Sequence, residues 1–365
     1  MTAATTAATT ASSSGSSGGG YQRPRRMRKA GGTFLWTLIA VVIVAAFLSP
    51  LLRSVSFSVK SNEQISQANS PLYPAAPITF SYEGHVYDVY QVPIDGTSRA
   101  LALVKKGRSS SDFLDPVHPE AGTITWQGSW RALDPAWQFS AHLENFQTVW
   151  DLLDYPRLLF NTIAIAVIGM IGTLLSCTLV AYGFARFRFP GRTLLFSLLI
   201  ATIFLPAAVT LIPTYTIFAR LGWVGTWLPL LVPTFFANAF DVFLMRQFFM
   251  TLPRELDEAA SIDGAGPLRI LRSIILPQSI PVVVAVGVFH LVYSWNDFFE
   301  PLIYLSTKPE LQPLAVGLAR FNGIHSREPA LIQAGTLMTL VVPVLLFIVF
   351  QRAFTRGVVI TGVDK

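Results

Sequence analysis

Glu258-Ala-Ala-Ser-Ile-Asp-Gly264, followed after nine further residues by Ile274-Ile-Leu276-Pro277, decides the fold because it forms a polar island between two long apolar segments. Pro253 suits a helix N-terminus, the acidic residues of the next turn are favoured by the helix dipole, and the glycine supplies a permissive turn. A second helix is predicted to start near Pro267 and to end before the last proline, since proline interrupts a helix interior. Residues 253–277 therefore predict two short helices joined by a turn.

The two predicted helices have the features of a docking surface. Ala259 and Ala260 are expected to make a flat face that another protein can approach closely. The second helix is predicted to have an apolar side and a basic side: Leu268, Leu271, Ile274 and Ile275 against Arg269 and Arg272. An interfacial helix resting on lipid headgroups has the same pattern, so the spacing alone leaves both interpretations open.

The whole chain has the composition of a membrane protein. Of its 365 residues, 52% are hydrophobic and only 13% are charged, which is too apolar for an ordinary soluble domain. A spanning helix needs about 20 mostly apolar residues, because lipid offers the backbone no hydrogen-bond partner. We therefore predict an all-α polytopic membrane protein with six transmembrane helices, at 34–52, 158–185, 194–218, 227–249, 278–303 and 331–350.

Lys and Arg residues are distributed unevenly between the loops, and short basic loops stay in the cytoplasm. One side of the predicted spans holds the basic positions within 23–29, 186–192, 246–272 and 352–365, whereas the other short loops hold only Arg220, Lys308, Arg320 and Arg327. We therefore predict a multi-pass protein of the inner (plasma) membrane with both termini in the cytoplasm. This topology also explains the net charge of +6, so no nucleic-acid partner is expected.

Residues 1–32 precede the first predicted span. Residues 1–20 are almost entirely Ala, Thr, Ser and Gly, which cannot bury enough apolar surface to offset the entropy of ordering. We predict a disordered cytoplasmic tail over 1–32 and a transmembrane helix over 33–52. A cleaved signal peptide is the competing interpretation, but the apolar run is long for one and no small-residue cleavage pattern follows it.

Residues 53–142 have a different character, with acids, bases, prolines and glycines throughout. The segments that predict strands are a hairpin at 78–90, centred on Glu83-Gly84, and two further stretches at 100–104 and 123–126. We predict a small extracytoplasmic β-rich insert without a disulfide, because the only cysteine, Cys177, lies in the second predicted span. Two roles fit this insert, a docking surface for a substrate-delivery protein and a cap without a binding role.

Five polar side chains fall inside the predicted spans: Asp241, His290, Asn296, Asp297 and Glu300. An acid at the bilayer centre costs about 3 kcal/mol on insertion scales, so such groups usually face a cavity or a partner. The last three lie within about one helical turn, where they can hydrogen-bond the hydroxyls of a substrate; pairing with a partner subunit or with interfacial water is the alternative. For His290 a helix-packing hydrogen bond is favoured over a ligand role. Asp241, nearer the cytoplasmic end of its span, has Arg246 as a candidate partner.

Prolines are predicted to kink the third and fourth spans, at positions 206, 213, 229 and 233. A kink frees backbone carbonyls, which then line a pathway or are satisfied by neighbouring helices. The kinks indicate a transporter without identifying what it carries.

The Glu-Ala-Ala motif, with three residues before Gly264 and nine more before Ile-x-Leu-Pro, resembles the cytoplasmic signature (EAA motif) of permease subunits in binding-protein-dependent ABC importers. Three further segments resemble the carbohydrate branch of that family, the maltose-type permease with six spans. These segments are 184–191, 295–303 and 357–364. The resemblance covers the first span and the chain from about residue 143 onward. The segment 60–138 departs from it by being longer than that branch usually carries, and Glu300 stands where a neutral residue is expected.

The resemblance implies a type I ABC importer permease fold with a permease core over 143–365. It also implies three kinds of partner besides the lipid bilayer: a second permease subunit, two ATPase subunits and an extracytoplasmic solute-binding protein. Residues 253–277 become the cytoplasmic coupling helices, through which ATP-driven closure of the ATPases drives alternating access. The implied ATPase-coupling residues are Glu258, Ala259, Ala260, Asp263, Gly264, Ile274, Leu276 and Pro277.

The chain itself is expected to bind no cofactor and to have no catalytic residue or metal site. It contains no Gly-x-x-x-x-Gly-Lys-Ser/Thr loop for nucleotide phosphates and no His-Glu-x-x-His or paired-cysteine metal motif. ATP and Mg are therefore expected on the partner ATPase. The predicted function is that of a non-enzymatic transporter subunit for a sugar or oligosaccharide.

Three other functions stay as alternatives. Glycerol-phosphate and polyol importers share the same branch of the family. A secondary transporter would need no ATPase and often shows an inverted internal repeat, which is not visible in the sequence. A membrane-anchored sensor or assembly factor would leave the coupling pattern unexplained.

Overall fold

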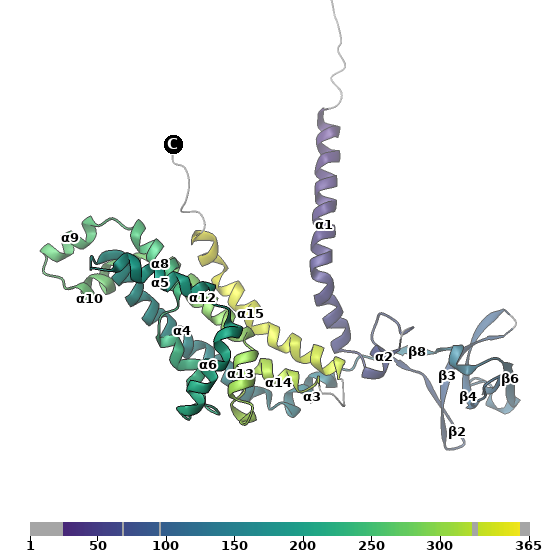
Figure 1. The fold of residues 1–365 in the computed structure, drawn as a ribbon. Coiled ribbons are helices and arrows are strands. Elements are labelled where there is room, and N and C mark those ends of the chain that lie inside the picture. Colours follow the sequence, from purple (N-terminus) through teal and green to yellow (C-terminus); the bar gives the residue numbers. More distant parts are fainter. Residues whose placement is uncertain (1–24, 68, 95, 323–327, 358–365) are drawn as a thin grey trace, which may run out of the picture. The chain divides into compact units, whose positions relative to one another are not determined.

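The structure is a computed structural model that describes residues 25–67, 69–94, 96–322 and 328–357 (Figure 1). The chain divides between Leu52 and Arg53, and the long helix α1 (Arg25–Ser58) begins before that boundary. Its side chains from 35 to 52 are exposed, which suits a helix surrounded by lipid or by another subunit. Residues 25–32 belong to α1, so the predicted disordered tail is wrong there, because Arg, Met, Lys and Ala favour a helix. Residues 1–24 of that predicted tail lie outside the described residues.

The segment predicted as a β-rich insert contains antiparallel strands. They are β1 (Ala75–Pro77), β2 (Thr79–Tyr82), β3 (His85–Ile94), β4 (Thr97–Lys105), β5 (Ser110–Leu114), β6 (Thr123–Gln127), β7 (Asp134–Pro135) and β8 (Trp137–Phe139). Strands β2 to β6 pair in sequence order, β7 pairs with β3, and β1 pairs with β8. The predicted hairpin is confirmed as β2–β3, where Glu83 and Gly84 both have positive φ, as tight hairpin turns require. The two other predicted strands fall within β4 and β6.

Successive side chains of β4 build two small cores. Ala102 packs in one cluster with Val89, whereas Leu101 and Leu103 pack in another with Phe113. Neighbouring side chains of a strand point to opposite faces of a sheet. Both faces of this small sheet are therefore partly covered by the insert's own side chains.

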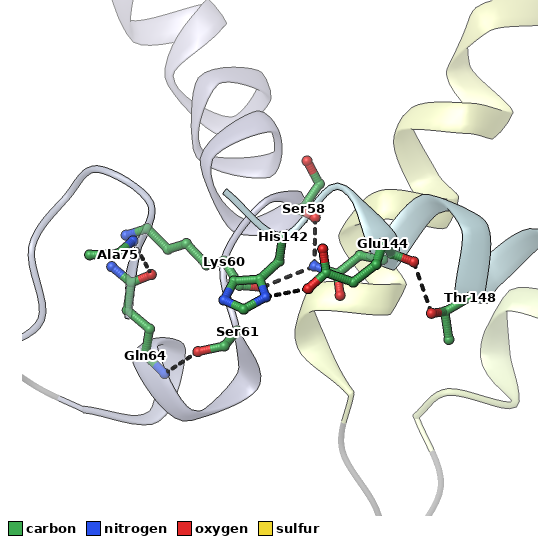
Figure 2. A network of polar contacts seen from close by, with 9 residues as sticks. Ser58, Lys60, Ser61, Gln64, Ala75, His142, Glu144 and Thr148 are labelled. Atoms are coloured by element: carbon green, nitrogen blue, oxygen red, sulfur yellow. Dashed lines mark hydrogen bonds and ion pairs between the residues drawn. The ribbon is translucent and has the colours of Figure 1, made fainter. Parts of the chain in front are cut away.

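A network of polar contacts joins residues 58–75 to α3 (Glu144–Leu152), as Figure 2 shows. Gln64, on the short helix α2 (Asn62–Ser66), is fully buried, and its side-chain amide bonds three backbone groups of the loop that leads into β1. Asn145 donates from its side-chain amide to the carbonyls of Ser58 and Lys60 at 2.9 and 3.0 Å. Both amides have hydrogen-bond partners, and the carbonyls to which Asn145 donates belong to the buried residues Ser58 and Lys60, so these contacts hold the start of the insert against α3.

The remaining helices follow the insert. They are α4 (Tyr155–Arg186), α5 (Arg192–Ala201), α6 (Ala207–Arg220), α7 (Leu228–Leu231), α8 (Ala239–Thr251), α9 (Glu255–Ile262), α10 (Pro267–Ile270), α11 (Leu276–Gln278), α12 (Ile280–Asn296), α13 (Phe299–Tyr304), α14 (Leu314–Ala319) and α15 (Pro329–Gly357). Helix α4 packs against both α8 and α12. Its buried small and polar side chains therefore lie at the centre of this helical part.

Four stretches in the described part of the chain are long and apolar enough to cross a membrane: Leu35–Ser58, Tyr155–Arg186, Leu228–Thr251 and Pro329–Gln351. Two bent pairs also qualify when each is taken as one span: Arg192–Phe204 with Ala208–Arg220, and Pro267–Gln278 with Ile280–Asn296. The third predicted span bends by 102° around Pro206. The fourth is interrupted by the 3-10 turn η4 (Val232–Phe235), which contains Pro233. Helix breaks therefore occur at two of the four predicted prolines, Pro206 and Pro233, whereas Pro213 lies inside α6 and Pro229 lies in the first turn of α7.

The fifth predicted span, 278–303, is not one continuous helix. Helix α12 ends at Asn296, and α13 begins at Phe299 after an extended residue, Asp297. Pro301, in the first turn of α13, marks this break in the sequence, because a proline has no N–H to donate to the carbonyl of residue 297. The three polar residues predicted to share one helical turn are therefore divided between the end of α12, the break and the start of α13.

Candidate functional site

The Glu-Ala-Ala motif lies on α9, and the following glycine closes that helix. Gly264 has a φ of +79°, a conformation that glycine adopts without steric cost. Its N–H donates to Ser261 O at 3.1 Å, and Ala265 N donates to Ala260 O at 2.9 Å, so the last carbonyls of α9 have partners. The predicted pair of short helices joined by a turn is present in the structure.

The second helix of the pair does not end before Pro277 as predicted. Helix α10 passes into a π-helical turn, Leu271–Ile275, and then into α11, where Pro277 lies in the first turn. Pro277 thus lies inside a continuous helical run, just after the π-helical turn, where the regular α-helical hydrogen-bond pattern is already interrupted. The segment then bends by 82° into α12. Ile274, Leu276 and Pro277 therefore lie where the loop joins the membrane part.

Apolar packing attaches the α9–α10 loop to the helical core. The loop side chains Ala260, Ile270, Leu271 and Ile275 are buried in one cluster with side chains of α4, α8 and α12. Buried methylene groups stabilise such a contact by about 0.8 kcal/mol each. The loop therefore has a defined position against α4 and α8.

Polar contacts add to this attachment at the end of α4. Arg186 Nε lies 3.1 Å from Asp257 Oδ2 in the first turn of α9, and Arg186 Nη2 donates to Leu252 O at 3.1 Å. Within the described residues, Arg186 Nε and Asp257 Oδ1 have no hydrogen-bond partner, so the contact between these side chains is an ion pair without a well-aligned hydrogen bond. Tyr182 Oη donates to Pro267 O at 3.2 Å. Both short helices of the loop are thus tied to α4.

The motif residues differ in exposure. Glu258, Ala259, Asp263, Gly264 and Pro277 are exposed, Ile274 and Leu276 are half-buried, and Ala260 is buried. The predicted flat face of two alanines is therefore wrong for Ala260, because neighbouring helical residues point about 100° apart and its side chain faces the core.

An apolar surface of the loop was not expected from the sequence. Ile262 is 87% exposed and Leu268 is 71% exposed, one on each side of the glycine turn. Leu268 was predicted to share a face with Leu271, which is buried. The only sequence signal for this surface is an isoleucine in the last turn of a polar helix.

A cavity of about 580 Å³ lies among α4, the α7–α8 segment and the α12–α13 segment. It is lined by Ile165, Thr173, Pro229, Leu230, Pro233, Thr234, Phe236, Asn238, Phe240, Asp241, Phe289, His290, Tyr293, Ser294, Asp297 and Glu300. Four of the five predicted pathway residues therefore meet at one cavity of a size typical for small-molecule sites. The fifth, Asn296, is not part of this lining, and its amide donates to Val292 O of its own helix at 2.8 Å.

Asp241 lies in the first turn of α8, a little closer to the Thr251 end than to the Leu228 end of the Leu228–Thr251 stretch. Asn238 caps this helix: its Oδ1 accepts from Asp241 N at 2.9 Å, and its Nδ2 donates to Asp241 Oδ2 at 2.5 Å. The predicted pairing of Asp241 with Arg246 is wrong, because five residues along a helix point about 140° apart. Arg246 Nε donates instead to Phe184 O at 3.3 Å.

His290 makes the interhelical contact that the packing interpretation predicts. Its Nδ1 lies 3.0 Å from Thr173 Oγ1 on α4. Its Nε2 is buried without a hydrogen-bond partner in the described part of the chain and faces Gly169, where a Cβ would come within 2.6 Å of that nitrogen. The ring is thus held between α4 and α12 at the cavity wall.

Asp297 and Glu300 flank the break between α12 and α13. The backbone of Asp297 is extended, with φ −69° and ψ 120°, and its Oδ1 accepts from Glu300 N at 3.4 Å. The carboxylate thereby satisfies one of the N–H groups left free at the start of α13. Because the chain turns here, both acidic side chains reach the cavity.

The side chains that can give the cavity a fixed charge are all acidic. Asp241, Asp297 and Glu300 line it, and none of its lining residues is Lys or Arg. Within the described residues, no group of three or more His, Cys, Asp or Glu side chains is arranged to hold a metal ion. The cavity thus offers hydrogen-bonding groups and carboxylates, but no fixed cation to pair with an anionic ligand.

Sequence reasoning missed the uncharged polar groups of this cavity: Thr173, Thr234, Asn238, Tyr293 and Ser294. Of these, only Asn238 has a sequence signal, because Asn before an apolar run with Asp three residues later fits a helix N-cap. The others are ordinary polar residues within apolar stretches, and only the packing of the helices brings them together.

Comparisons with known proteins add to this geometry. The family model described as "Binding-protein-dependent transport system inner membrane component" matches residues 172–359. The osmoprotective compounds uptake permease protein GgtD of Synechocystis sp. (strain ATCC 27184 / PCC 6803 / Kazusa) is 30% identical over 279 residues, covering 75% of this chain and 93% of its own. The sn-glycerol-3-phosphate transport system permease protein UgpE of Shigella flexneri serotype 5b (strain 8401) is 36% identical over 225 residues, covering 60% of this chain and 79% of its own.

Among solved structures, the chain shares its fold with a bacterial ABC transporter involved in the import of the acidic polysaccharide alginate, with a TM-score of 0.61 and 20% sequence identity. The match covers 90% of this chain and 98% of that chain.

Proposed function

Since this chain belongs to the family of binding-protein-dependent transport system inner membrane components, we propose that it encloses one alternating-access pathway together with a second permease subunit. The chain is the permease component of an ABC importer, has the type I importer permease fold, and is not itself an enzyme. In our proposal the bent pair Arg192–Phe204 with Ala208–Arg220 counts as one span, and α12 forms another without the cytoplasmic segment Pro267–Gln278, giving six spans in the plasma membrane. Both termini then lie in the cytoplasm and residues 53–142 lie on the external side.

We assign the coupling function to the α9–α10 loop. Two ATPase subunits, which bind the ATP and Mg, grip this loop on the cytoplasmic side. Its exposed motif residues Glu258, Ala259, Asp263 and Gly264 form the contact, and Ala260, Ile274, Leu276 and Pro277 pass the movement on because they lie against the core or at the bend into α12. A solute-binding protein delivers the substrate from the external side.

The lining of the cavity carries our proposal for the substrate. Three carboxyl side chains and five uncharged polar side chains face it, without Lys or Arg. An anionic solute would lose its hydration there without gaining a cation from this chain, which is unfavourable. Sugar and polyol hydroxyls can donate to carboxylates and also accept from Asn, Thr, Ser and Tyr. We therefore favour an uncharged polyhydroxy solute over sn-glycerol-3-phosphate, the anion in the UgpE name.

Uptake by the complete importer tests this function. The chain is reconstituted with its co-expressed permease, ATPase and solute-binding subunits in proteoliposomes containing ATP and Mg, and labelled disaccharides, polyols and sn-glycerol-3-phosphate are offered outside. We expect ATP-dependent uptake of at least one uncharged solute. Uptake of sn-glycerol-3-phosphate at a comparable rate would contradict the substrate class, and uptake that needs no ATP would favour a secondary transporter.

A further inference from the structure

A second hollow, separate from the membrane cavity, is strongly basic. It has a volume of about 460 Å³ and is formed by the loop between α4 and α5, the first turn of α5 and the residue before α9. Its lining residues are Arg188, Phe189, Gly191, Arg192, Thr193, Leu194 and Arg254. Three guanidinium groups thus line one small surface depression that contains no acidic side chain.

The positive charge of this hollow is not compensated within the described part of the chain. None of the three arginines there forms an ion pair, and the one hydrogen bond that their side chains donate runs from Arg192 Nη1 to Phe187 O at 3.2 Å. Arg186, only two residues before Arg188, shows the contrast, because it is buried and paired with Asp257. Guanidinium groups left free in this way present several N–H donors to a bound anion.

The backbone adds a second anion-attracting feature. Helix α5 is ten residues long, and its N-terminus opens into the hollow. Gly191 precedes it with a φ of +76°, and no side chain caps the helix. Free N–H groups and the helix dipole both favour a negative group at such a position.

The hollow also borders an apolar surface. Leu194 lines it and is 65% exposed, and Leu198, one helical turn further along α5, is 56% exposed. Leu195 is exposed as well, so the start of α5 presents a leucine surface beside the arginines. A ligand that fits both parts needs a negative headgroup attached to an apolar tail.

We propose that this hollow binds the phosphate-containing headgroup of an anionic phospholipid, with its acyl chains along Leu194 and Leu198. The guanidinium groups of Arg188, Arg192 and Arg254 supply the charge-assisted hydrogen bonds to the phosphate oxygens. Because Arg254 immediately precedes α9, the bound headgroup also connects the α4–α5 loop to the coupling loop. An acidic surface of an ATPase subunit is the competing occupant, but α5 belongs to a proposed membrane span, so Leu194 and Leu198 lie where acyl chains are present beside the arginines.

Lipid retention by the assembled importer tests the site. The complex is extracted from membranes containing phosphatidylglycerol and phosphatidylcholine, and retained lipids are counted by native mass spectrometry. We expect selective retention of phosphatidylglycerol, falling about tenfold in the triple variant Arg188→Gln/Arg192→Gln/Arg254→Gln, since hydrogen bonds to charged groups contribute at least that factor. The matched control is Arg269→Gln/Arg272→Gln, which removes exposed arginines of the same loop outside the hollow and should retain the lipid as wild type does.

Three results would overturn the proposal. Equal retention in the triple variant and the control would mean that the hollow does not select the lipid. Displacement of phosphatidylglycerol by millimolar inorganic phosphate would identify a site for free phosphate. Loss of the ATPase subunits from the triple variant, with lipid retention unchanged, would assign the arginines to the ATPase interface.

Discussion

Arg186 Nε lies 3.1 Å from Asp257 Oδ2, which joins the end of α4 to the first turn of α9. The arginine side chain is only 6% exposed, whereas the aspartate side chain is 21% exposed. The same guanidinium donates to Leu252 O, in the turn before α9. A single buried cation therefore fixes both the start of the coupling loop and the turn that leads into it.

Removal of one partner of this pair should loosen the coupling loop. Asp257→Ala leaves a buried guanidinium without its counter-charge, and we expect the free energy of unfolding to fall by about 1–3 kcal/mol. Thermal unfolding of the detergent-solubilised chain measures this. Arg157→Ala is the control, because the Arg157–Asp154 pair is more than half exposed on both sides and should contribute less than about 1 kcal/mol. Equal losses in the two variants would show that burial of the Arg186 pair has no particular effect.

Substitutions on the exposed side of α9 should uncouple ATP hydrolysis from transport. Glu258→Lys reverses a charge on the exposed face, and Gly264→Asp places a side chain at a φ of +79°, so both change the contact surface or the turn. We expect loss of substrate-stimulated ATPase activity and uptake in the reconstituted importer, while the chain is still inserted. Gly222→Asp is a matched control, because Gly222 has a φ of +70°, has no atom within 4 Å of an added Cβ, as is true of Gly264, and lies outside the coupling loop. Unchanged coupling in both loop variants would refute the lever function of this loop.

The exposed apolar side chains of the same loop, Ile262 and Leu268, should contribute to binding of the ATPase subunits. Ile262→Asp or Leu268→Asp replaces a side chain that is largely exposed in this chain, so the stability of the isolated permease should change by less than about 0.5 kcal/mol. Association with the ATPase subunits should nevertheless weaken, as interface anchors typically contribute 1 kcal/mol or more, about a fivefold change in affinity. Pull-down of the ATPase measures this. Full retention in both variants would remove these residues from the interface.

Close helix packing at the cavity depends on Gly172 of α4. A Cβ at position 172 would lie 2.5 Å from Thr234 Oγ1 and 2.8 Å from a ring carbon of Phe235. Gly172→Ala should therefore destabilise the chain by about 1–3 kcal/mol through overpacking. Gly183→Ala on the same helix meets no atom within 4 Å and should be neutral or stabilising by up to about 1 kcal/mol. Thermal unfolding of both variants distinguishes them, and equal behaviour would contradict the close approach.

Local chemistry explains what could be predicted from the sequence. The coupling helices follow from Pro253 and Gly264, and the β2–β3 hairpin follows from Glu83-Gly84, because turn and cap preferences act over a few residues. Apolar length likewise predicts the long helices, since lipid imposes it directly. These features need no knowledge of which segments pack together.

Tertiary packing decides what could not be predicted. Pro301 is compatible with either a kinked continuous helix or a break at Asp297, and the break is accompanied by a carboxylate contact with the start of α13. Ala260 differs from Ala259 only because one of them faces α4 and α8. The cavity is likewise assembled from residues more than 100 positions apart, such as Thr173 and His290. Such long-range contacts leave no periodic signal in a single sequence.

The junction shown in Figure 2 separates a buried contact from an exposed one at neighbouring residues. Asn145→Ala removes both hydrogen bonds to Ser58 O and Lys60 O, and we expect a loss of about 1–3 kcal/mol because buried carbonyls are left without partners. Glu144→Gln removes only an exposed carboxylate that contacts His142, and should cost less than about 1 kcal/mol. Thermal unfolding at neutral pH compares the two, and an equal or larger effect of Glu144→Gln would contradict the assignment.

The contribution of Glu144 to the stability of the fold should also depend on pH. Hydrogen bonds from its own backbone and from the His142 side chain hold the pKa of the Glu144 carboxyl below its ordinary value of 4.5. The ionised carboxylate therefore stabilises the fold fully above that ordinary value, and this contribution is lost as the pH falls through the lowered pKa of the folded state. The stability difference between wild type and Glu144→Gln should thus be present at pH 6 and shrink toward acid pH, whereas the Asn145→Ala deficit should persist because an amide does not titrate. A Glu144→Gln difference that grows as the pH falls would reverse the sign of this linkage.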